Sequence, residues 1–111
     1  MRRRELVAAL AAGLAAAASG GAALAAPAPR VRTITMKDMV FGPVPADLRV
    51  GDVVIWANDD IFRHTATARD RSFDVDLAPK ARRRMTLTKA GTVAFYCRFH
   101  PGMTGRLTVA K

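Results

Sequence analysis

The stretch Val93–Met103 reads VAFYCRFHPGM and combines a strand pattern with a short loop. Its first five residues place Phe95 and Cys97 on one face and smaller or polar-tipped side chains on the other, which is the period-two pattern of a half-buried strand. We therefore expect Cys97 to point inward at the end of a strand. His100 and Met103 follow in a segment whose Pro-Gly pair marks a tight loop between two strands.

The same alternation recurs on both sides of this stretch. Apolar residues alternate with threonine or other polar residues in three further segments, around Ile34 and Met36, Met85 and Leu87, and Leu107 and Val109. The run Val53–Trp56 is continuously apolar, as expected for a strand in the middle of a sheet. Prolines and glycines separate the short strands, and no long helical period follows residue 30. These patterns predict an all-β sandwich of about seven to eight strands.

The chain has 111 residues, enough for one small domain, and it begins with a segment of a different kind. Three arginines precede an alanine-leucine run, which ends near small residues that suit a signal peptidase. We expect residues 1–25 to be a secretory signal peptide, residues 26–31 a Pro-Ala linker and residues 32–111 the folded domain. The arginines also partly match a twin-arginine export signal. An uncleaved membrane anchor is the alternative, although Ser19, Gly20 and Gly21 shorten the apolar run.

The single cysteine needs an explanation in an exported protein. The whole chain carries 18 basic and 9 acidic residues, a formal charge of +9. The predicted mature part is a basic domain with a small core and no possible internal disulfide. A lone thiol in an oxidising compartment is exposed to oxidation or intermolecular pairing unless a ligand occupies it.

Four side chains form a candidate metal site: His64, Cys97, His100 and Met103. One cysteine, two histidines and a weak axial methionine are the ligands of a blue-copper electron-transfer site. Each residue also has an ordinary interpretation, since Cys97 and Met103 could fill the core and the histidines could lie at the surface or in a turn. Both histidines and the only cysteine of the chain would then have to coincide by accident. We therefore expect one type 1 copper ion, cycling between Cu(I) and Cu(II), as the cofactor.

Across most of the predicted mature domain, the sequence resembles the cupredoxins, particularly the amicyanin and plastocyanin-like type. The resemblance rests on Phe41 and Pro43, on Val50–Asp60 leading to His64, and on Ala90–Thr92 before the Cys97 loop. It implies a Greek-key β-sandwich with His64, Cys97, His100 and Met103 as the copper ligands. The two-residue gap between His100 and Met103 most resembles amicyanin.

Some positions depart from the amicyanin pattern. Thr65 follows the first histidine where many relatives have asparagine, and Arg98 follows the cysteine in place of a small hydroxyl residue. We expect the Thr65 backbone N–H to point at the Cys97 sulfur, with the side-chain tie between the two loops built differently. Phe99, Pro101 and Gly102 should surround the exposed edge of His100. Met39 resembles a methionine that amicyanin has on the same face.

The expected function is to carry single electrons between proteins, not to catalyse a reaction. Four ligands on one copper use up every histidine and cysteine, and no catalytic triad or acid-base pair is apparent. Asp74 and Asp76 read as a solvated strand edge. A copper chaperone or storage module is the alternative from another class, and a secreted β-domain without metal is a third.

The expected partners are redox proteins in the periplasm. The resemblance implies a donor such as a dehydrogenase and an acceptor such as a cytochrome or oxidase. Arg63 and Arg98 flank two ligands, and further basic residues lie elsewhere in the domain: Arg69, Arg71, Lys80, Arg82, Arg83 and Arg84. One interpretation is that these charges attract a partner with an acidic docking surface. The other is that they form an ordinary solvated face. We expect a monomer with no membrane span in the mature chain, and no nucleic-acid partner, since the aromatic residues form no stacking platform.

Overall fold

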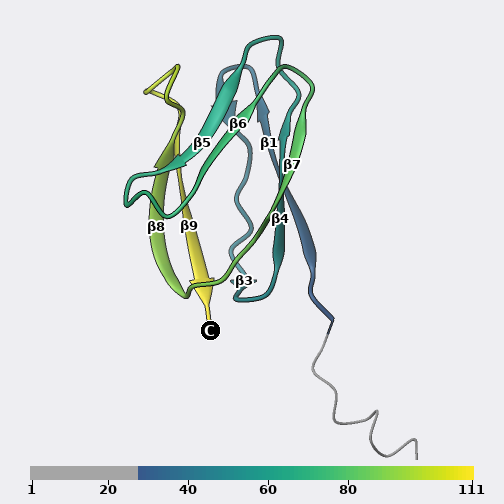
Figure 1. The fold of residues 1–111 in the computed structure, drawn as a ribbon, viewed down its shortest axis with the longest axis vertical. Coiled ribbons are helices and arrows are strands. Elements are labelled where there is room, and N and C mark those ends of the chain that lie inside the picture. Colours follow the sequence, from purple (N-terminus) through teal and green to yellow (C-terminus); the bar gives the residue numbers. More distant parts are fainter. Residues whose placement is uncertain (1–27) are drawn as a thin grey trace, which may run out of the picture.

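A computed structural model describes residues 28–111, which form a sandwich of two β-sheets (Figure 1). The described residues contain nine strands: β1 (Val31–Lys37), β2 (Val40–Phe41), β3 (Leu48–Arg49), β4 (Val53–Asn58), β5 (His64–Ala68), β6 (Asp74–Leu77), β7 (Arg82–Thr86), β8 (Gly91–Tyr96) and β9 (Thr104–Ala110). The all-β sandwich prediction is confirmed. The count exceeds the expected seven to eight because β2 and β3 are only two residues long, too short to show an alternation.

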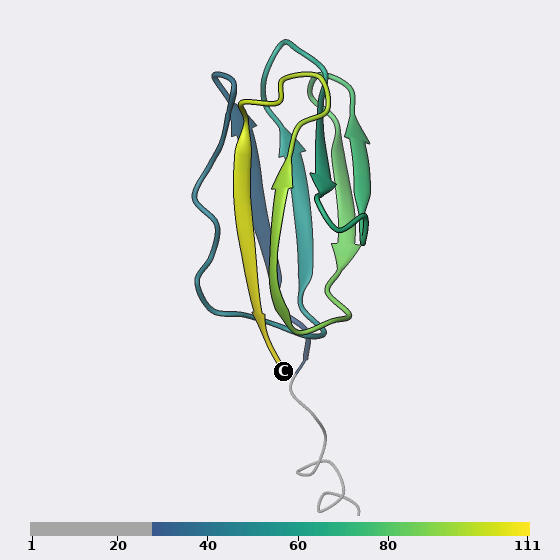
Figure 2. The same cartoon turned by 90° about the vertical axis from the view of Figure 1, so that its left-hand side faces the viewer.

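The two sheets pack face to face (Figure 2) and hold four and five strands. One has the order β2-β1-β4-β7 and the other the order β3-β9-β8-β5-β6. Two of the pairings are parallel, β1 with β4 and β3 with β9, and the rest are antiparallel. The apolar run Val53–Trp56 lies in β4, between β1 and β7, as its composition predicts.

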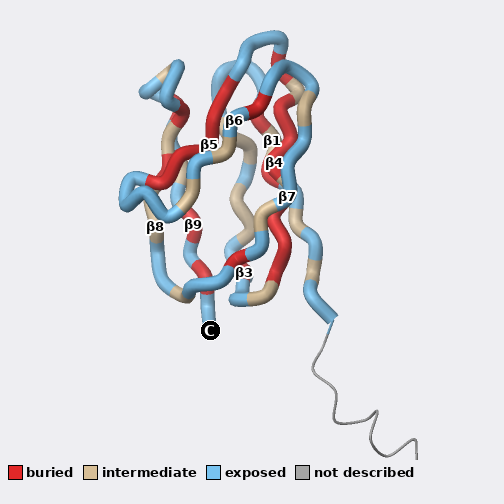
Figure 3. Tube along the Cα trace, in the orientation of Figure 1, coloured by how far each residue is buried: buried red, intermediate tan, exposed pale blue. Residues whose placement is uncertain are grey.

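The buried residues of the core lie between the sheets (Figure 3). Aromatic rings form the centre of this core. Trp56 from one sheet and Phe95 from the other are fully buried, with their ring centroids 5.1 Å apart in an edge-to-face arrangement. Phe41 packs against both rings, with its centroid 4.8 Å from that of Phe95 and 6.2 Å from that of Trp56. Gly105 on β9 faces the Phe95 ring so closely that a Cβ atom there would overlap it. The position of this ring therefore requires glycine on the neighbouring strand.

We predict that Gly105→Ala lowers the free energy of unfolding by about 1 to 3 kcal/mol, because the added methyl group must displace the Phe95 ring from a packed core. Urea denaturation of the two proteins measures the difference. Gly102→Ala is the matched control, since a Cβ atom at Gly102 meets no other atom within 4 Å. An unchanged midpoint for Gly105→Ala would show that the ring moves without cost.

An ion pair between a half-buried arginine and a buried aspartate closes the end of the sandwich where the described chain begins. The Arg30 guanidinium binds the Asp52 carboxylate through Nη2 at 2.8 Å and Nε at 3.3 Å, and it also reaches Asp47 at 3.0 Å. The Arg30 carbonyl accepts a hydrogen bond from Val53 N at 2.8 Å. Arg30, which lies within the predicted linker, thus makes contacts with the folded domain. The pattern missed this because a single arginine in a Pro-Ala segment gives no sign of a partner 22 residues away.

The Arg30 side chain, and next the Arg49 backbone N–H, lower the pKa of Asp52 from 3.8 to about 2 against the opposing effect of burial. Because the pKa is lower in the folded state, this ion pair stabilises the fold above about pH 4, and the contribution disappears as the pH falls toward 2. We predict that Asp52→Asn is less stable than the wild type at neutral pH and loses less stability between pH 4 and pH 2. Denaturation at several pH values tests this. Asp38→Asn, in an exposed turn, should keep the wild-type profile; parallel profiles for Asp52→Asn and the wild type would contradict the prediction.

The two ends of the sandwich differ in what they carry. The described chain starts at the lower end of Figure 1, and the C-terminus lies at that end too. The connections from β1 to β2, β4 to β5 and β8 to β9 lie at the opposite end, and they include or adjoin all four predicted ligands. The predicted signal peptide and most of the predicted linker lie outside the described residues.

Candidate metal centre

The pairing of β5 with β8 brings two predicted ligands together. These strands are antiparallel, with Thr67 opposite Tyr96. Continued toward the upper end of Figure 1, that register brings the first residues of β5 beside the segment that follows β8. His64 is the first residue of β5 and Cys97 directly follows β8, so one strand pair supplies an imidazole and a thiol.

Three donor side chains converge at this point. The Cys97 Sγ atom lies 3.8 Å from Nδ1 of His64 and 3.7 Å from Nδ1 of His100. One potential ligand atom from each of the three residues lies within 4.8 Å of the others, and this is the one such group found among residues 28–111. Metal–nitrogen and metal–thiolate bonds of about 2.0 and 2.3 Å, at a trigonal angle of about 120°, separate the two donor atoms by about 3.7 Å. The observed distances therefore fit one metal ion between the three side chains.

The ligand loop is short and tied to itself. Met103 N donates to the His100 carbonyl at 2.8 Å, and Cys97 N donates to the Met103 carbonyl at 3.1 Å. These bonds fold the loop so that its first and last residues lie side by side. Cys97 is fully buried and Met103 nearly so, whereas His100 is only half-buried. The structure thus brings together His64, Cys97 and His100, and backbone bonds place Met103 in the same loop, where its role as a fourth ligand stays a prediction.

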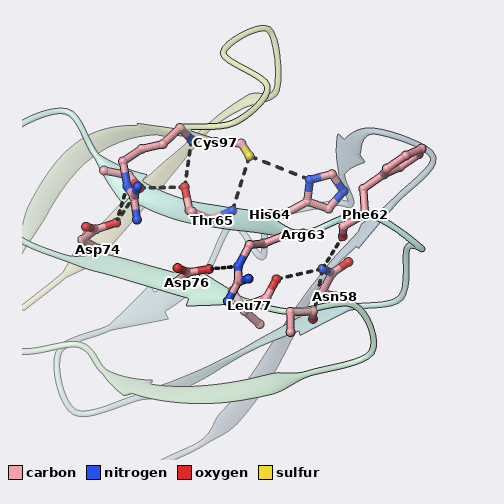
Figure 4. Close-up of polar contacts among 12 residues, drawn as sticks. Asn58, Phe62, Arg63, His64, Thr65, Asp74, Asp76, Leu77 and Cys97 are labelled. Atoms are coloured by element: carbon pink, nitrogen blue, oxygen red, sulfur yellow. Dashed lines mark hydrogen bonds and ion pairs between the residues drawn. The ribbon is translucent and has the colours of Figure 1, made fainter.

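Thr65 ties the two ligand-bearing segments together (Figure 4). Its backbone N–H donates to the Cys97 sulfur at 3.3 Å, as the sequence predicted. Its side-chain Oγ1 accepts the Arg98 backbone N–H at 2.9 Å. Oγ1 also lies 2.8 Å from the Thr67 hydroxyl, which itself donates to Asp74 Oδ1 at 2.8 Å. Because the Thr67 proton is committed to Asp74, Thr65 is the donor to Thr67. Threonine therefore replaces the expected asparagine with a chain of hydroxyl groups.

We predict that Thr65→Val lowers the free energy of unfolding by about 1 to 3 kcal/mol, because the Arg98 N–H and the Thr67 hydroxyl lose their partner in a buried site. Urea denaturation of the metal-free protein measures the loss. Thr92→Val removes a comparable contact, 3.3 Å to Thr108, from an exposed sheet face and should cost less than about 0.5 kcal/mol. Equal losses in the two variants would show that the Thr65 hydroxyl is not a special tie.

A buried carboxylate behind His64 was missed by the sequence analysis. Asp60 Oδ2 lies 2.9 Å from His64 Nε2, and the two side chains are 10% and 0% exposed. The same oxygen accepts the Met39 backbone N–H at 3.0 Å. The hydrogen bond to His64, and to a lesser degree the one from Met39, lower the pKa of Asp60 from 3.8 to about 2. Asp60 is therefore ionised at neutral pH. An aspartate four residues before a histidine in a loop has no periodicity that could have revealed this contact.

Asn58 organises the loop that carries Asp60 and His64. It is fully buried at the end of β4. Its side-chain Nδ2 lies within hydrogen-bond distance of three backbone carbonyls, those of Phe62, Leu77 and Ala78, at 2.8, 3.1 and 3.2 Å. Its Oδ1 accepts the Asp60 N–H at 3.0 Å. The asparagine therefore fixes the path of the chain just before the first ligand.

The structure places Arg63 and Arg98 in ion pairs. Arg63 Nε binds Asp76 at 2.9 Å and Arg98 Nε binds Asp74 at 3.1 Å, all on exposed or half-exposed side chains. The hydrogen bond from Thr67, and next the one from Arg98, lower the pKa of Asp74. Asp74 and Asp76 thus pair with the arginines beside the site. The sequence predicted only that they lie on a solvated strand edge.

Apolar side chains surround the exposed side of His100. Phe99 and Phe62 are each 48% exposed, and Ile61 is 72% exposed. The Phe62 ring centroid lies 6.1 Å from that of His100. The sequence indicated Phe99 but not Ile61 and Phe62, although an apolar pair between Asp60 and Arg63 was a visible sign. Met39, at 36% exposure, lies in a turn bonded to the His64 loop through Asp60.

A β-sandwich with a buried thiol, two imidazoles and a methionine at one end defines the class of small copper proteins. Comparison with protein families matches residues 6–109 to the Cupredoxin-like domain family, so the chain belongs to this family. The prediction of a cupredoxin is confirmed, and His64, Cys97 and His100 are arranged as a copper-binding site. The match starts within the predicted signal peptide, and the boundaries at residues 25 and 31 stay predictions.

Solved structures show the same fold. A purple cupredoxin from Nitrosopumilus maritimus is 24% identical, with a TM-score of 0.65, over 71% of this chain and 99% of that one. The Cu(I) form of an amicyanin mutant is 26% identical, with a TM-score of 0.62, over 79% of this chain and 88% of that one. A copper-containing nitrite reductase from Thermus scotoductus is 30% identical, with a TM-score of 0.66, over 78% of this chain but only 23% of that longer one.

A search of curated proteins returned no match. Among the described residues, no helix is long and apolar enough to cross a membrane.

Proposed function

We propose that this chain is a periplasmic type 1 copper protein that carries single electrons between redox proteins. The observation that carries the proposal is the convergence of one thiol and two imidazoles at 3.7 and 3.8 Å, with one of the imidazoles half-exposed. When bound, copper supplies one-electron chemistry between Cu(I) and Cu(II). The structural likeness to amicyanin and to a purple cupredoxin supports the same use.

In this proposal the protein holds copper through His64, Cys97, His100 and Met103. The Cys97 sulfur is the soft donor that suits Cu(I), and the imidazoles suit both oxidation states. Met103 closes the ligand loop and would supply a weak thioether donor. The ligands come from two segments tied by Thr65, so they keep one arrangement. A site of fixed geometry needs little rearrangement when an electron arrives or leaves.

His100 is the proposed route for electrons to and from partners. It is the one half-exposed imidazole of the site, and Ile61, Phe62 and Phe99 lie exposed around it. Exposed apolar side chains that are gathered on one face favour contact with another protein. A donor such as a dehydrogenase and an acceptor such as a cytochrome or oxidase would both approach this face.

We still propose that the partner has an acidic surface, but we assign its attraction to basic residues other than Arg63 and Arg98. Arg63 and Arg98 are each paired with an aspartate, so their charges are largely offset. Within the described residues, Arg83 and Arg84 of β7 belong to no ion pair, and both are exposed. Long-range attraction from such residues would speed the encounter more than it would strengthen the complex.

We propose electron transfer and not an enzymatic reaction. The whole chain has two histidines and one cysteine, and all three converge in the single site. None is left to build a second metal centre or to act as a general base at another place. The nitrite reductase among the similar structures is a much longer chain, of which this one spans 23%.

Absorption and EPR spectra of the protein with one equivalent of Cu(II) test the proposal, followed by ascorbate and reoxidation. We predict an intense visible charge-transfer band that bleaches and returns. Cys97→Ser should abolish the band, and Met103→Leu should keep copper bound but raise the reduction potential by removing the axial donor. Met85→Leu, the same change at a half-buried core position, should leave spectrum and potential as in the wild type.

The possible outcomes separate the functions. A Cys97→Ser protein that stayed blue would contradict the site. A pale wild-type complex that gives up Cu(I) readily to a chelator would replace the electron carrier with a copper chaperone or storage module. A protein that binds neither Cu(II) nor Cu(I) would be a β-domain without metal.

A further inference from the structure

The two ring nitrogens of His64 face two different groups. Nδ1 lies 3.8 Å from the Cys97 sulfur, on the side where the donor atoms converge. Nε2 lies 2.9 Å from Oδ2 of Asp60, on the opposite side of the ring. The imidazole is fully buried and the Asp60 side chain is 10% exposed. A carboxylate is thus placed directly behind a metal-binding ring.

The chemistry of this contact fixes the proton of the ring. A neutral imidazole carries one N–H, and an ionised carboxylate can only accept a hydrogen bond. The proton therefore lies on Nε2, and Nδ1 keeps a free lone pair that points toward the Cys97 sulfur. Groups behind a metal-ligating histidine set its tautomer and orientation, and they make it a more basic ligand.

We propose that Asp60 is a positioning residue of the copper site: it holds His64 in the Nε2–H tautomer, and its negative charge favours Cu(II) over Cu(I). This inference rests on the proposed function, because it assumes that the site holds copper. Charge adjacent to a ligand acts in a dry interior, where its effect is screened less than at the surface. Asp60 thereby lowers the reduction potential of the site.

Asp60 is itself held in place, so its charge cannot turn away. Oδ2 accepts the Met39 N–H at 3.0 Å in addition to the histidine, and Oδ1 lies 3.1 Å from the Ile61 N–H. Its own N–H donates to Asn58 Oδ1 at 3.0 Å. The bond to Met39 comes from the turn between β1 and β2, where Asp38 and Met39 both have positive φ angles of 53° and 64°. Two loops and the end of β4 therefore hold the carboxylate.

The neighbouring Asp59 provides a matched control. It belongs to the same loop and carries the same charge, but its side chain is 42% exposed and lies 3.5 Å from Arg82. Asp59→Asn thus removes a charge near the site without removing a contact to a ligand. Asp60→Asn removes the charge while keeping an oxygen that can accept from Nε2, and Asp60→Ala removes both.

The first test is the reduction potential of the copper-loaded proteins. For Asp60→Asn we expect the preference for Cu(II) over Cu(I) to fall about tenfold. For a one-electron couple this raises the reduction potential by about 59 mV. Asp59→Asn should shift the potential much less. Asp60→Ala should also change the EPR spectrum, since the His64 ring is then free to tilt. Equal shifts for Asp59→Asn and Asp60→Asn, or no shift for Asp60→Asn, would overturn the proposal.

The second test uses the metal-free protein, and its main result comes from the wild type and not from a variant. Nitrogen-15 NMR of the metal-free wild-type chain, at a pH where the ring is neutral, reports which nitrogen of His64 carries the proton. We expect the Nε2–H tautomer in the wild type and in Asp59→Ala, and a mixture in Asp60→Ala. A wild-type ring protonated on Nδ1 would overturn the proposal even if the variants failed to fold.

The two tests also separate this inference from the proposed function. If the copper site is blue and reversible but its reduction potential is unchanged in Asp60→Asn, the inference is overturned and the proposed electron transfer is not. A protein that forms no blue site would overturn the proposed function, and the NMR spectrum would still decide whether Asp60 fixes the ring.

Discussion

The hydrogen bond from the Thr65 N–H to the Cys97 sulfur is the contact on which the rest of the site depends. The Cys97 sulfur is fully buried, and a buried polar atom is stabilised by a hydrogen-bond partner. This donor comes from the strand that also carries His64, so the bond fixes the distance between the first imidazole and the sulfur. The register of β5 against β8 places the two segments, and the Thr65 hydroxyl holds the next turn of chain through Arg98.

The parts of this structure that could be predicted from sequence are those with a period or a rare residue. Alternation located the strands that bury Ile34, Met36, Phe95 and Leu107. The inward direction of Cys97 followed from the same pattern, and the scarcity of histidine and cysteine identified the donors. Copper as the cofactor and the cupredoxin family were both confirmed.

The parts that could not be predicted depend on pairs of residues brought together by the fold. Asp60 and Asn58 lie in a loop without periodicity, and their partners are fixed only by how the chain turns. The use of the Thr65 hydroxyl depends on the register of two strands, which a pattern does not give. Arg30 lies in a segment with the composition of a linker, yet it is held by an aspartate far along the sequence.

The two imidazoles of the site are placed for different tasks. His64 is enclosed, with Nε2 bonded to a carboxylate and Nδ1 facing the Cys97 sulfur. His100 lies in a short loop and reaches the surface among apolar side chains. One imidazole therefore belongs to the rigid frame of the site, and the other connects that frame to the protein surface.

The placement of the chain ends has a consequence for how this domain can be joined to others. The C-terminus and the first described residues lie at one end of the sandwich, and the connection from β8 to β9, which carries His100, lies at the other (Figure 1). A protein module joined after β9 would therefore attach away from the ligand loop. The similar nitrite reductase, of which this chain spans 23%, contains such a sandwich as one part of a longer chain.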